Sequence, residues 1–135
     1  MPNRCSIYDI DLLANAVGRP QAFQLLARPD YEFYRVGENS IILLKHLTPY
    51  LYEAHIHFNN NDFRKVLKDG LELKDYIFKT TECIKVLFMI PIDKKSIIKF
   101  CKCAGASYEG RLNKSFKNSN GCILDQVIYT LTKEI

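Results

Sequence analysis

The N-terminal part of the chain carries apolar side chains at the three- and four-residue spacing of amphipathic helices. This pattern predicts a helix over residues 7–17, which Ser6 caps and Gly18 ends. Pro20 suits the first turn of a second short helix, and Pro29 closes that helix because proline cannot continue it. The apolar positions of the first helix are Ile7, Ile10, Leu13, Ala14 and Val17.

Three segments in which apolar and polar residues alternate come next, over residues 31–36, 40–47 and 51–58. Alternation with a period of two is the pattern of a strand that has one buried face. Turn residues, among them Gly37 and Pro49, separate the segments. We therefore expect an antiparallel meander of three strands.

The second half of the chain alternates between helical and strand patterns. Asp62 caps a helix over residues 62–79, in which Gly70 allows a neighbour to approach closely. Residues 85–90, with the continuous apolar run from Val86 to Ile90, are typical of a strand buried on both faces. The remaining elements are a helix over residues 94–104 and a hairpin of strands over 107–114 and 122–132. This order predicts a single domain of the α/β (α+β) class, with a mixed, mostly antiparallel central sheet and helices on both faces.

Composition narrows the class of protein. The 135 residues are 47% hydrophobic and 25% charged, which excludes a disordered tail, a coiled coil and a collagen-like chain. The longest apolar runs are too short to cross a bilayer, and Asp9 and Asp11 interrupt any signal-peptide pattern. We expect a soluble, cytoplasmic protein without membrane contact. The five cysteines form no Cys-x-x-Cys pair, which indicates reduced thiols and no metal site.

Charge is distributed unevenly along the chain. Residues 1–60 hold 5 basic and 6 acidic side chains and residues 61–135 hold 14 and 9, which gives net charges of −1 and +5. The positive excess favours an anionic partner: a phosphorylated cofactor, a nucleic acid or an acidic protein. A plain solvated basic surface explains the same excess. Because no aromatic row interleaves the lysines, nucleic acid is the least favoured of these partners.

One predicted strand carries three polar side chains on the same face. Glu53, His55 and His57 alternate with apolar residues, which places neighbours in this row about 7 Å apart. A carboxylate or an imidazole in such a row can act as a general base, directly or through water. A His-x-His pair is also a fragment of a metal site, although further ligands would have to come from elsewhere. A row of solvated polar residues without chemistry is the third interpretation.

The last third of the chain holds a spaced set of glycine, acidic and tyrosine residues: Gly105, Ala106, Glu109, Gly110, Gly121, Asp125 and Tyr129. This set resembles the end of many members of the GNAT superfamily of N-acetyltransferases. Ala106 stands where those members usually have phenylalanine. The resemblance implies the GNAT fold over residues 1–135 and, in active members, transfer of an acetyl group from acetyl-CoA to an amine.

The cofactor loop departs from the family pattern. Active members hold the coenzyme A diphosphate on the amides of a glycine-rich loop at a helix start, because a side chain would block those amides. The equivalent stretch, residues 59–67, has no glycine, and Asp62 would place a carboxylate where the diphosphate binds. No cofactor is therefore assured, although the resemblance allows acetyl-CoA. Its candidate ligands are Asn60, Asn61, Arg64, Lys65 and Ser96.

Two further family features bear on activity. Active members place a tyrosine four residues before the Gly-Phe pair to protonate the leaving thiolate, and Cys101 occupies that position. A thiol can donate a proton, but an apolar helix face favours simple packing. In active members the strand equivalent to residues 51–58 splays from the one equivalent to 85–90, and the opening admits the pantetheine arm. A closed gap would favour a protein without catalytic activity.

The strand sequence Tyr-Glu-Ala-His-Ile-His-Phe at residues 52–58 is similar to that of small GNAT-like proteins of tailed bacteriophages. Some of these are named head-assembly proteins and others acetyltransferases. The similarity implies a non-catalytic or strongly diverged binding module for virion assembly, in the host cytoplasm or in the virion. Its partner would be a virion or host protein, and a homo-oligomer is compatible with it. The alternative is an acetyl-CoA-dependent N-acetyltransferase with an atypical loop and Glu53 or His55 as general base.

Overall fold

The structure is a computed structural model that describes residues 2–59 and 62–134. The strands are β1 (Asn3–Arg4), β2 (Tyr31–Val36), β3 (Ser40–His46), β4 (Leu51–His57), β5 (Lys85–Pro91), β6 (Ser107–Lys117) and β7 (Ile123–Thr132). The helices are η1 (Ile7–Asp9), α1 (Ile10–Val17), α2 (Arg19–Leu26), α3 (Phe63–Thr80) and α4 (Lys95–Cys103). No helix within the described residues combines the length and the apolar composition that crossing a bilayer requires.

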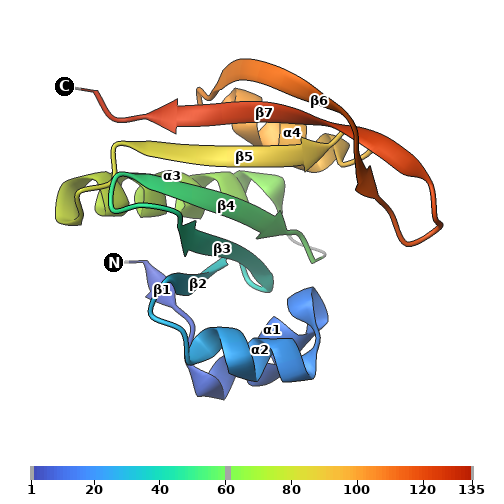
Figure 1. Ribbon diagram of the computed structural model, residues 1–135. Helices are drawn as coiled ribbons and strands as arrows, with labels where there is room; N and C mark the ends of the chain where they lie inside the picture. Colours follow the sequence, from blue (N-terminus) through green and yellow to red (C-terminus); the bar gives the residue numbers. More distant parts are fainter. Residues whose placement is uncertain (1, 60–61, 135) are drawn as a thin grey trace.

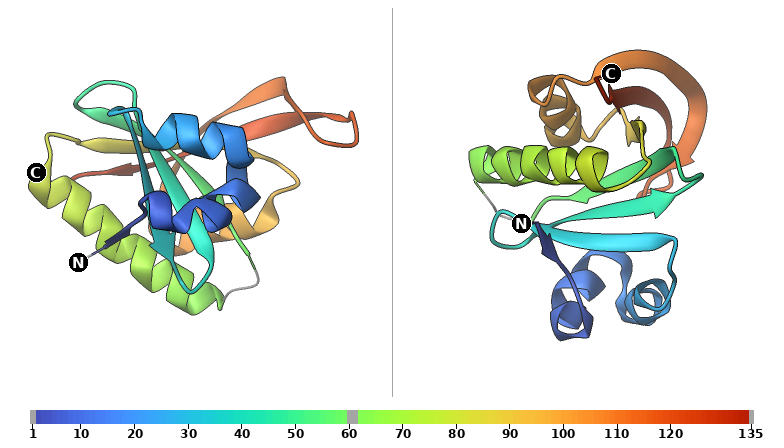
Figure 2. Two further views of the ribbon diagram at one scale, coloured as in Figure 1. Left: turned by 90° about the horizontal axis from the view of Figure 1, so that it is seen from below. Right: turned by 90° about the vertical axis from the view of Figure 1, so that its left-hand side faces the viewer.

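All strands belong to one seven-stranded sheet in the order β1-β2-β3-β4-β5-β7-β6 (Figure 1). Neighbouring strands are antiparallel except β4 and β5, which run parallel because the α3 crossover joins them. Helices α1 and α2 cover one face of the sheet, and α3 and α4 cover the other (Figure 2). The predicted fold class, a mixed and mostly antiparallel sheet with helices on both faces, is confirmed.

The sheet separates two apolar cores. Alternation along β3 decides which side chain enters which core. Ile41 and Leu43 face α1 and α2, whereas Ile42 and Leu44 face α3 and α4. The larger core, under α3 and α4, holds the buried side of β4 and therefore directs the polar side of β4 to the opposite face.

Helix α3 packs closely against α4 at a glycine. A Cβ atom on Gly70 would lie 2.6 Å from the Cζ atom of Phe100, which is shorter than any ordinary contact. Phe100 is itself buried, so its ring has no room to move aside. The close approach expected at Gly70 is confirmed.

Four local features differ from the sequence prediction. Strand β5 was predicted to be buried on both faces, but its side chains alternate between buried positions, such as Val86 and Phe88, and partly buried ones, such as Leu87. Residues 7–9 form the tighter helix η1 rather than the first turn of an α-helix. The predicted Ser6 cap is present: Asp9 accepts a hydrogen bond from the Ser6 amide at 2.8 Å, and Ser6 Oγ accepts one from the Tyr8 amide at 3.3 Å. Strand β1 was not predicted, since two residues show no alternation. Strand β6 continues past residue 114 to Lys117.

Both edges of the sheet are short or irregular. β1 forms one edge with two residues, and β6 forms the other. The register between β6 and β7 shifts twice, between Tyr108 and Gly110 and between Leu112 and Phe116. Such bulges bend a strand, and Figure 1 shows the bend in the β6–β7 hairpin.

Candidate active site between β4 and β5

The parallel strands β4 and β5 separate partway along their length. They pair only from Leu51 to Glu53 on β4 and from Lys85 to Leu87 on β5. Beyond these residues the strands diverge toward their carboxyl ends (Figure 1). A hollow of about 190 Å³ lies in the gap, so side chains do not close it. Its walls include Ala54, His55, Phe88, Met89, Lys94 and Phe116. The splay between these strands that the resemblance implies is confirmed.

The hollow lies where two helices begin. Helix α3 starts after the carboxyl end of β4, and α4 starts after the carboxyl end of β5 (Figure 1). Open α/β sheets bind their ligands at this edge, outside the carboxyl ends of parallel strands. The Lys99 ammonium lies 4.6 Å from the centroid of the Phe63 ring and links the start of α3 to α4.

The structure brings together two of the three polar residues predicted on β4. Oε1 of Glu53 lies 3.2 Å from Nε2 of His55. The His55 side chain is 50% exposed and lines the hollow. Glu53 is mostly buried and stands at the last paired position of the strand, opposite Leu87. The pair therefore lies at the point where the two strands separate.

His57 lies on the same face of β4 but outside this pair. It stands opposite Ile41 of β3. Within residues 2–59 and 62–134, no ion pair joins His57 to Glu53 or His55, and no three metal-ligating side chains gather into a group. The chemical unit is therefore the pair of Glu53 and His55, and the metal interpretation of His-x-His receives no support.

The geometry of the pair suits proton transfer. A carboxylate beside an imidazole holds the ring in one orientation and favours one tautomer. With Nε2 directed at Glu53, Nδ1 is the His55 nitrogen left to accept a proton from a ligand. Because His55 is half exposed, a ligand in the hollow has access to it.

Asp62 caps α3, as the sequence predicts. Its Oδ1 accepts a hydrogen bond from the Arg64 amide at 3.0 Å. Its carbonyl oxygen accepts from the amides of Lys65 and Val66, both at 3.1 Å. These three amides already have an acceptor, and a carboxylate stands at the positive end of the helix. A diphosphate bound at this helix start would have to displace the Asp62 carboxylate from the Arg64 amide.

The structure does not gather the predicted cofactor ligands into one set. Asn60 and Asn61 lie outside the described residues. Arg64 and Lys65 are exposed in the first turn of α3, and Ser96 is exposed in the first turn of α4. The structure describes all three of these residues, and none of them lines the hollow.

Lys94, Met89 and Phe116 line the hollow but were not predicted as site residues. The position of Lys94, just after the carboxyl end of a parallel strand, is a signal that could have found it. Phe116 comes from β6, and the bend of the hairpin brings it over β4 and β5. No sequence pattern reports such a bend.

Cys101 is a core residue. Its side chain is fully buried between α4 and the sheet. Burial raises the pKa of the Cys101 thiol to about 12, so the thiol stays neutral. The packing role predicted for this position is confirmed, and the thiol does not reach the hollow.

Two of the residues that carry the family resemblance, Asp125 and Glu109, anchor the C-terminal hairpin. Asp125 accepts hydrogen bonds from the Lys114 amide and the Arg111 guanidinium, both at 2.8 Å. These two donors hold the pKa of the Asp125 carboxyl below its usual range. Glu109 pairs with Lys85 of β5 at 3.1 Å. In this chain the motif therefore stabilises the hairpin that supplies Phe116 to the hollow.

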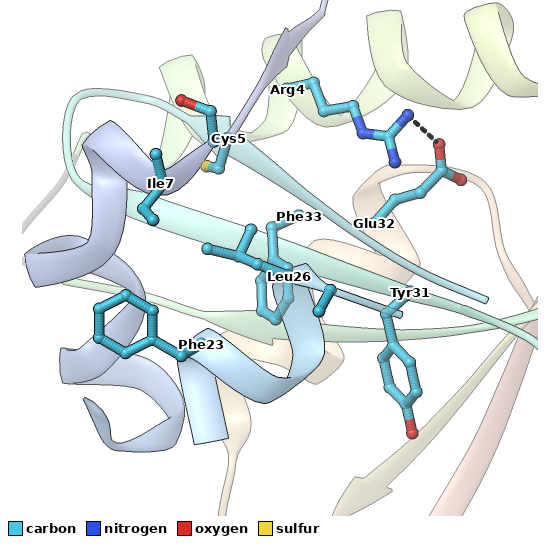
Figure 3. Close-up of a pocket in the computed structure, with 10 residues that line it drawn as sticks. Arg4, Cys5, Ile7, Phe23, Leu26, Tyr31, Glu32 and Phe33 are labelled. Atoms are coloured by element: carbon cyan, nitrogen blue, oxygen red, sulfur yellow. Dashed lines mark ion pairs between the residues drawn. The ribbon is translucent and has the colours of Figure 1, made fainter. Parts of the chain in front are cut away.

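A second hollow, of about 330 Å³, lies between the N-terminal segment, α2 and β2. Its walls, shown in Figure 3, include Phe23, Leu26, Phe33, Arg4 and Glu32. Arg4 and Glu32 form an ion pair at 3.3 Å. The Cys5 thiol in its wall stays protonated, because burial and then the Asp9 carboxylate raise its pKa to about 12. The hollow between β4 and β5 is therefore the better candidate for chemistry.

Comparison with solved structures identifies the fold. A mutant form of spermidine N-acetyltransferase SpeG from Vibrio cholerae matches with a TM-score of 0.79 at 11% identity, over 98% of this chain and 94% of that chain. The smu.2055 protein of Streptococcus mutans matches with a TM-score of 0.75 at 16% identity, over 98% of each chain. A probable GNAT-family acetyltransferase from Chromobacterium violaceum matches with a TM-score of 0.72 at 12% identity, over 87% of this chain and 67% of that chain.

At these identities the similarity shows the fold alone, and this chain has the fold of the GNAT acetyltransferases. No protein-family model and no curated protein matches the sequence. None of the structures named above bears on the phage-type assembly role, which stays a prediction.

Proposed function

We propose that this chain is an acyltransferase that transfers an acyl group from a thioester to an amine. The observation that carries the proposal is the half-exposed His55, paired with Glu53, in the wall of the hollow where β4 and β5 separate. The fold supports the same conclusion, because proteins named as acetyltransferases share it.

The hollow suits an extended ligand. Residues 54–57 of β4 and 88–91 of β5 do not pair with one another, so their facing backbone groups are available to a chain that runs between them. The Ala54 and Phe88 side chains give the slot an apolar wall. The residues present therefore fit the pantetheine arm of a thioester, although a nucleotide diphosphate at the start of α3 would compete with the Asp62 carboxylate for the Arg64 amide.

A bound acyl thioester supplies an activated carbonyl carbon and a thiolate leaving group. The acceptor amine attacks that carbon, so that a C–N bond forms and the C–S bond breaks. The proton that the nitrogen loses passes to Nδ1 of His55, while Glu53 orients the imidazole and offsets its new positive charge. His55 then releases this proton to solvent, and the thiolate takes up a proton from solvent. The products are an amide and a free thiol.

The test is thiol release from acetyl-pantetheine in the presence of primary amines, with spermidine among them. Glu53→Gln is expected to lower kcat by about 10- to 100-fold with little change in KM for the thioester. Glu72→Gln, which alters an exposed glutamate of α3, is the matched control and is expected to retain full turnover. Unchanged turnover in Glu53→Gln would remove Glu53 from the mechanism, and absence of thiol release with every amine would contradict the transferase proposal.

A non-catalytic binding module, such as the virion-assembly role predicted from the phage-type resemblance, is the second candidate. Two observations favour it: the Asp62 carboxylate binds the Arg64 amide at the helix start, and Cys101, buried and neutral, stands where the resemblance implies a proton donor. In this case neither acetyl-CoA nor acetyl-pantetheine should raise the melting temperature. A ligand at 100 times its Kd adds about 2.7 kcal/mol of stability, so a clear upward shift would contradict this candidate.

A further inference from the structure

Basic side chains are concentrated near the hollow between β4 and β5, and one of them, Lys94, lines it. These side chains belong to two segments that follow the two splayed strands: residues 62–68, after β4 and at the start of α3, and residues 93–99, after β5 and at the start of α4. Each segment contains three basic residues and one acidic residue. The basic residues are Arg64, Lys65, Lys68, Lys94, Lys95 and Lys99, and all six are exposed. The two segments are adjacent, because Lys99 lies over the Phe63 ring.

This basic surface is poorly suited to a small nucleotide. Its cations are exposed and belong to two different helices, and exposed charges are screened and contribute little individually. A diphosphate is usually held by backbone amides at a helix start, and at the start of α3 the Asp62 carboxylate already accepts from the Arg64 amide. The slot for a thioester arm is therefore open, while the Asp62 carboxylate competes for the helix start at which the nucleotide end of coenzyme A would bind.

We propose that the acyl donor is an acidic carrier protein that bears its acyl group on a phosphopantetheine arm. The arm enters the splay between β4 and β5, and the acidic surface of the carrier lies against this basic surface. A carrier needs no diphosphate cradle, because its arm ends in a single phosphodiester on the protein surface. Many weak exposed charges spread over two helices suit a macromolecular surface, where they guide association and set partner choice. This inference rests on the proposed acyl transfer.

The transfer balances in the same way as with any thioester. The amine nitrogen forms the new amide bond, the C–S bond breaks, and the carrier leaves with a free thiol on its arm. The amine proton passes through His55 to solvent, and no oxidant, reductant or further co-reactant is required.

The experiment compares three donors with one amine: acetyl-pantetheine, acetyl-CoA and an acidic acyl carrier protein loaded with acetyl-phosphopantetheine. We expect kcat/KM for the acetyl-carrier to exceed that for acetyl-CoA by at least about tenfold, and to fall as ionic strength rises. If kcat/KM for acetyl-CoA equals that for the acetyl-carrier, the carrier proposal is wrong. The proposed acyl transfer itself would still stand. No transfer from any donor, acetyl-pantetheine included, would overturn the proposed function itself.

Charge reversal at the basic surface provides the matched variants. Lys65→Glu combined with Lys95→Glu is expected to lower kcat/KM for the acetyl-carrier at least about tenfold and to leave acetyl-pantetheine turnover unchanged. The control reverses Lys79 and Lys102, which lie in the last turns of the same two helices. New carboxylates are favourable at helix starts and unfavourable at helix ends, so unfolding would affect the control more than the test variant. If kcat/KM for the acetyl-carrier is the same in the test variant and in the control variant, the proposal is wrong.

Discussion

Two histidine–glutamate pairs lie on the same sheet, on opposite faces, and their surroundings differ. His46 Nε2 of β3 lies 2.6 Å from Glu32 Oε2 of β2, and His55 Nε2 lies 3.2 Å from Glu53 Oε1 of the same strand. The His46 side chain is 28% exposed and that of His55 is 50% exposed. The same two residue types thus form one tight pair between strands and one looser pair at the wall of a hollow.

The partners of each carboxylate explain the difference. Glu32 also accepts a hydrogen bond from the Tyr34 hydroxyl at 2.9 Å and pairs with Arg4 at 3.3 Å. Burial, followed by the Glu32 charge, raises the pKa of Tyr34, so its hydroxyl remains a donor. His46 stacks on the buried Tyr52 ring at 4.0 Å between centroids. This pair is fixed from several sides and links strands β1 to β4, which is a structural role.

The pair on β4 has fewer constraints. Among the described residues, no second ion pair reaches Glu53, and His55 faces the gap between β4 and β5. A histidine that is oriented on one side and open on the other can exchange a proton with a ligand. What separates a catalytic candidate from a structural pair is therefore the number of partners, and the two pairs provide controls for each other.

The largest expected effect is on catalysis. His55→Ala should lower thiol release by about 100-fold or more, because it removes the general base, and change the free energy of unfolding by at most about 0.5 kcal/mol. His46→Ala should do the reverse and keep turnover per folded molecule. Steady-state kinetics and urea unfolding on both variants check this. Similar kinetic losses in the two variants would remove the distinction between the pairs.

The next effect is on stability. Glu32→Ala should lower the free energy of unfolding by about 2–4 kcal/mol, because the buried Tyr34 hydroxyl and His46 lose their acceptor. Glu53→Gln should cost less than about 1 kcal/mol, since Glu53 serves one half-exposed partner. Urea unfolding monitored by circular dichroism measures both. Equal losses would show that Glu53 is as firmly embedded as Glu32.

A smaller effect separates the stack of His46 from its ion pair. His46→Phe keeps an aromatic ring against Tyr52 and removes the contact with Glu32, whereas His46→Ala removes both. We expect His46→Phe to be more stable than His46→Ala by about 1 kcal/mol. The difference in urea midpoint measures this value. A phenylalanine variant no more stable than the alanine variant would assign the whole contribution to the ion pair.

The smallest expected effect is on the pH dependence of stability. It concerns Asp125, a carboxylate that pairs with neither His46 nor His55 and therefore serves as a reference. Its pKa is lower in the folded state than in the unfolded state, because the Lys114 amide and the Arg111 guanidinium bind the charged form. Its contribution to stability is therefore present at neutral pH and is lost as the pH falls below about 4. Asp125→Asn should be less stable than the wild type at pH 7, and the gap should narrow on acidification. A gap independent of pH in urea titrations would contradict the role of this charge.

Local chemistry made most of the fold predictable. Alternation with a period of two placed Glu53, His55 and His57 on one face, and Asp62 was identifiable as a cap from its position before a helical pattern. The features that escaped prediction depend on distant partners. Glu32 and His46 are 14 residues apart and meet only when β2 and β3 pair in register. Phe116 reaches the hollow through bulges that no residue pattern reveals, and the family resemblance, rather than the residues, suggested the splay.

The irregular edges of the sheet have a consequence for how copies of this chain can meet. An edge strand joins a second sheet only if it offers a regular row of free amide and carbonyl groups. β1 offers two residues, and β6 is interrupted by two register shifts and by Lys114 in the left-handed conformation, at φ 48°. Ribbon growth from sheet to sheet is thus blocked at both ends. An assembly built through the helical faces or the loops is therefore favoured over one built by pairing of sheet edges.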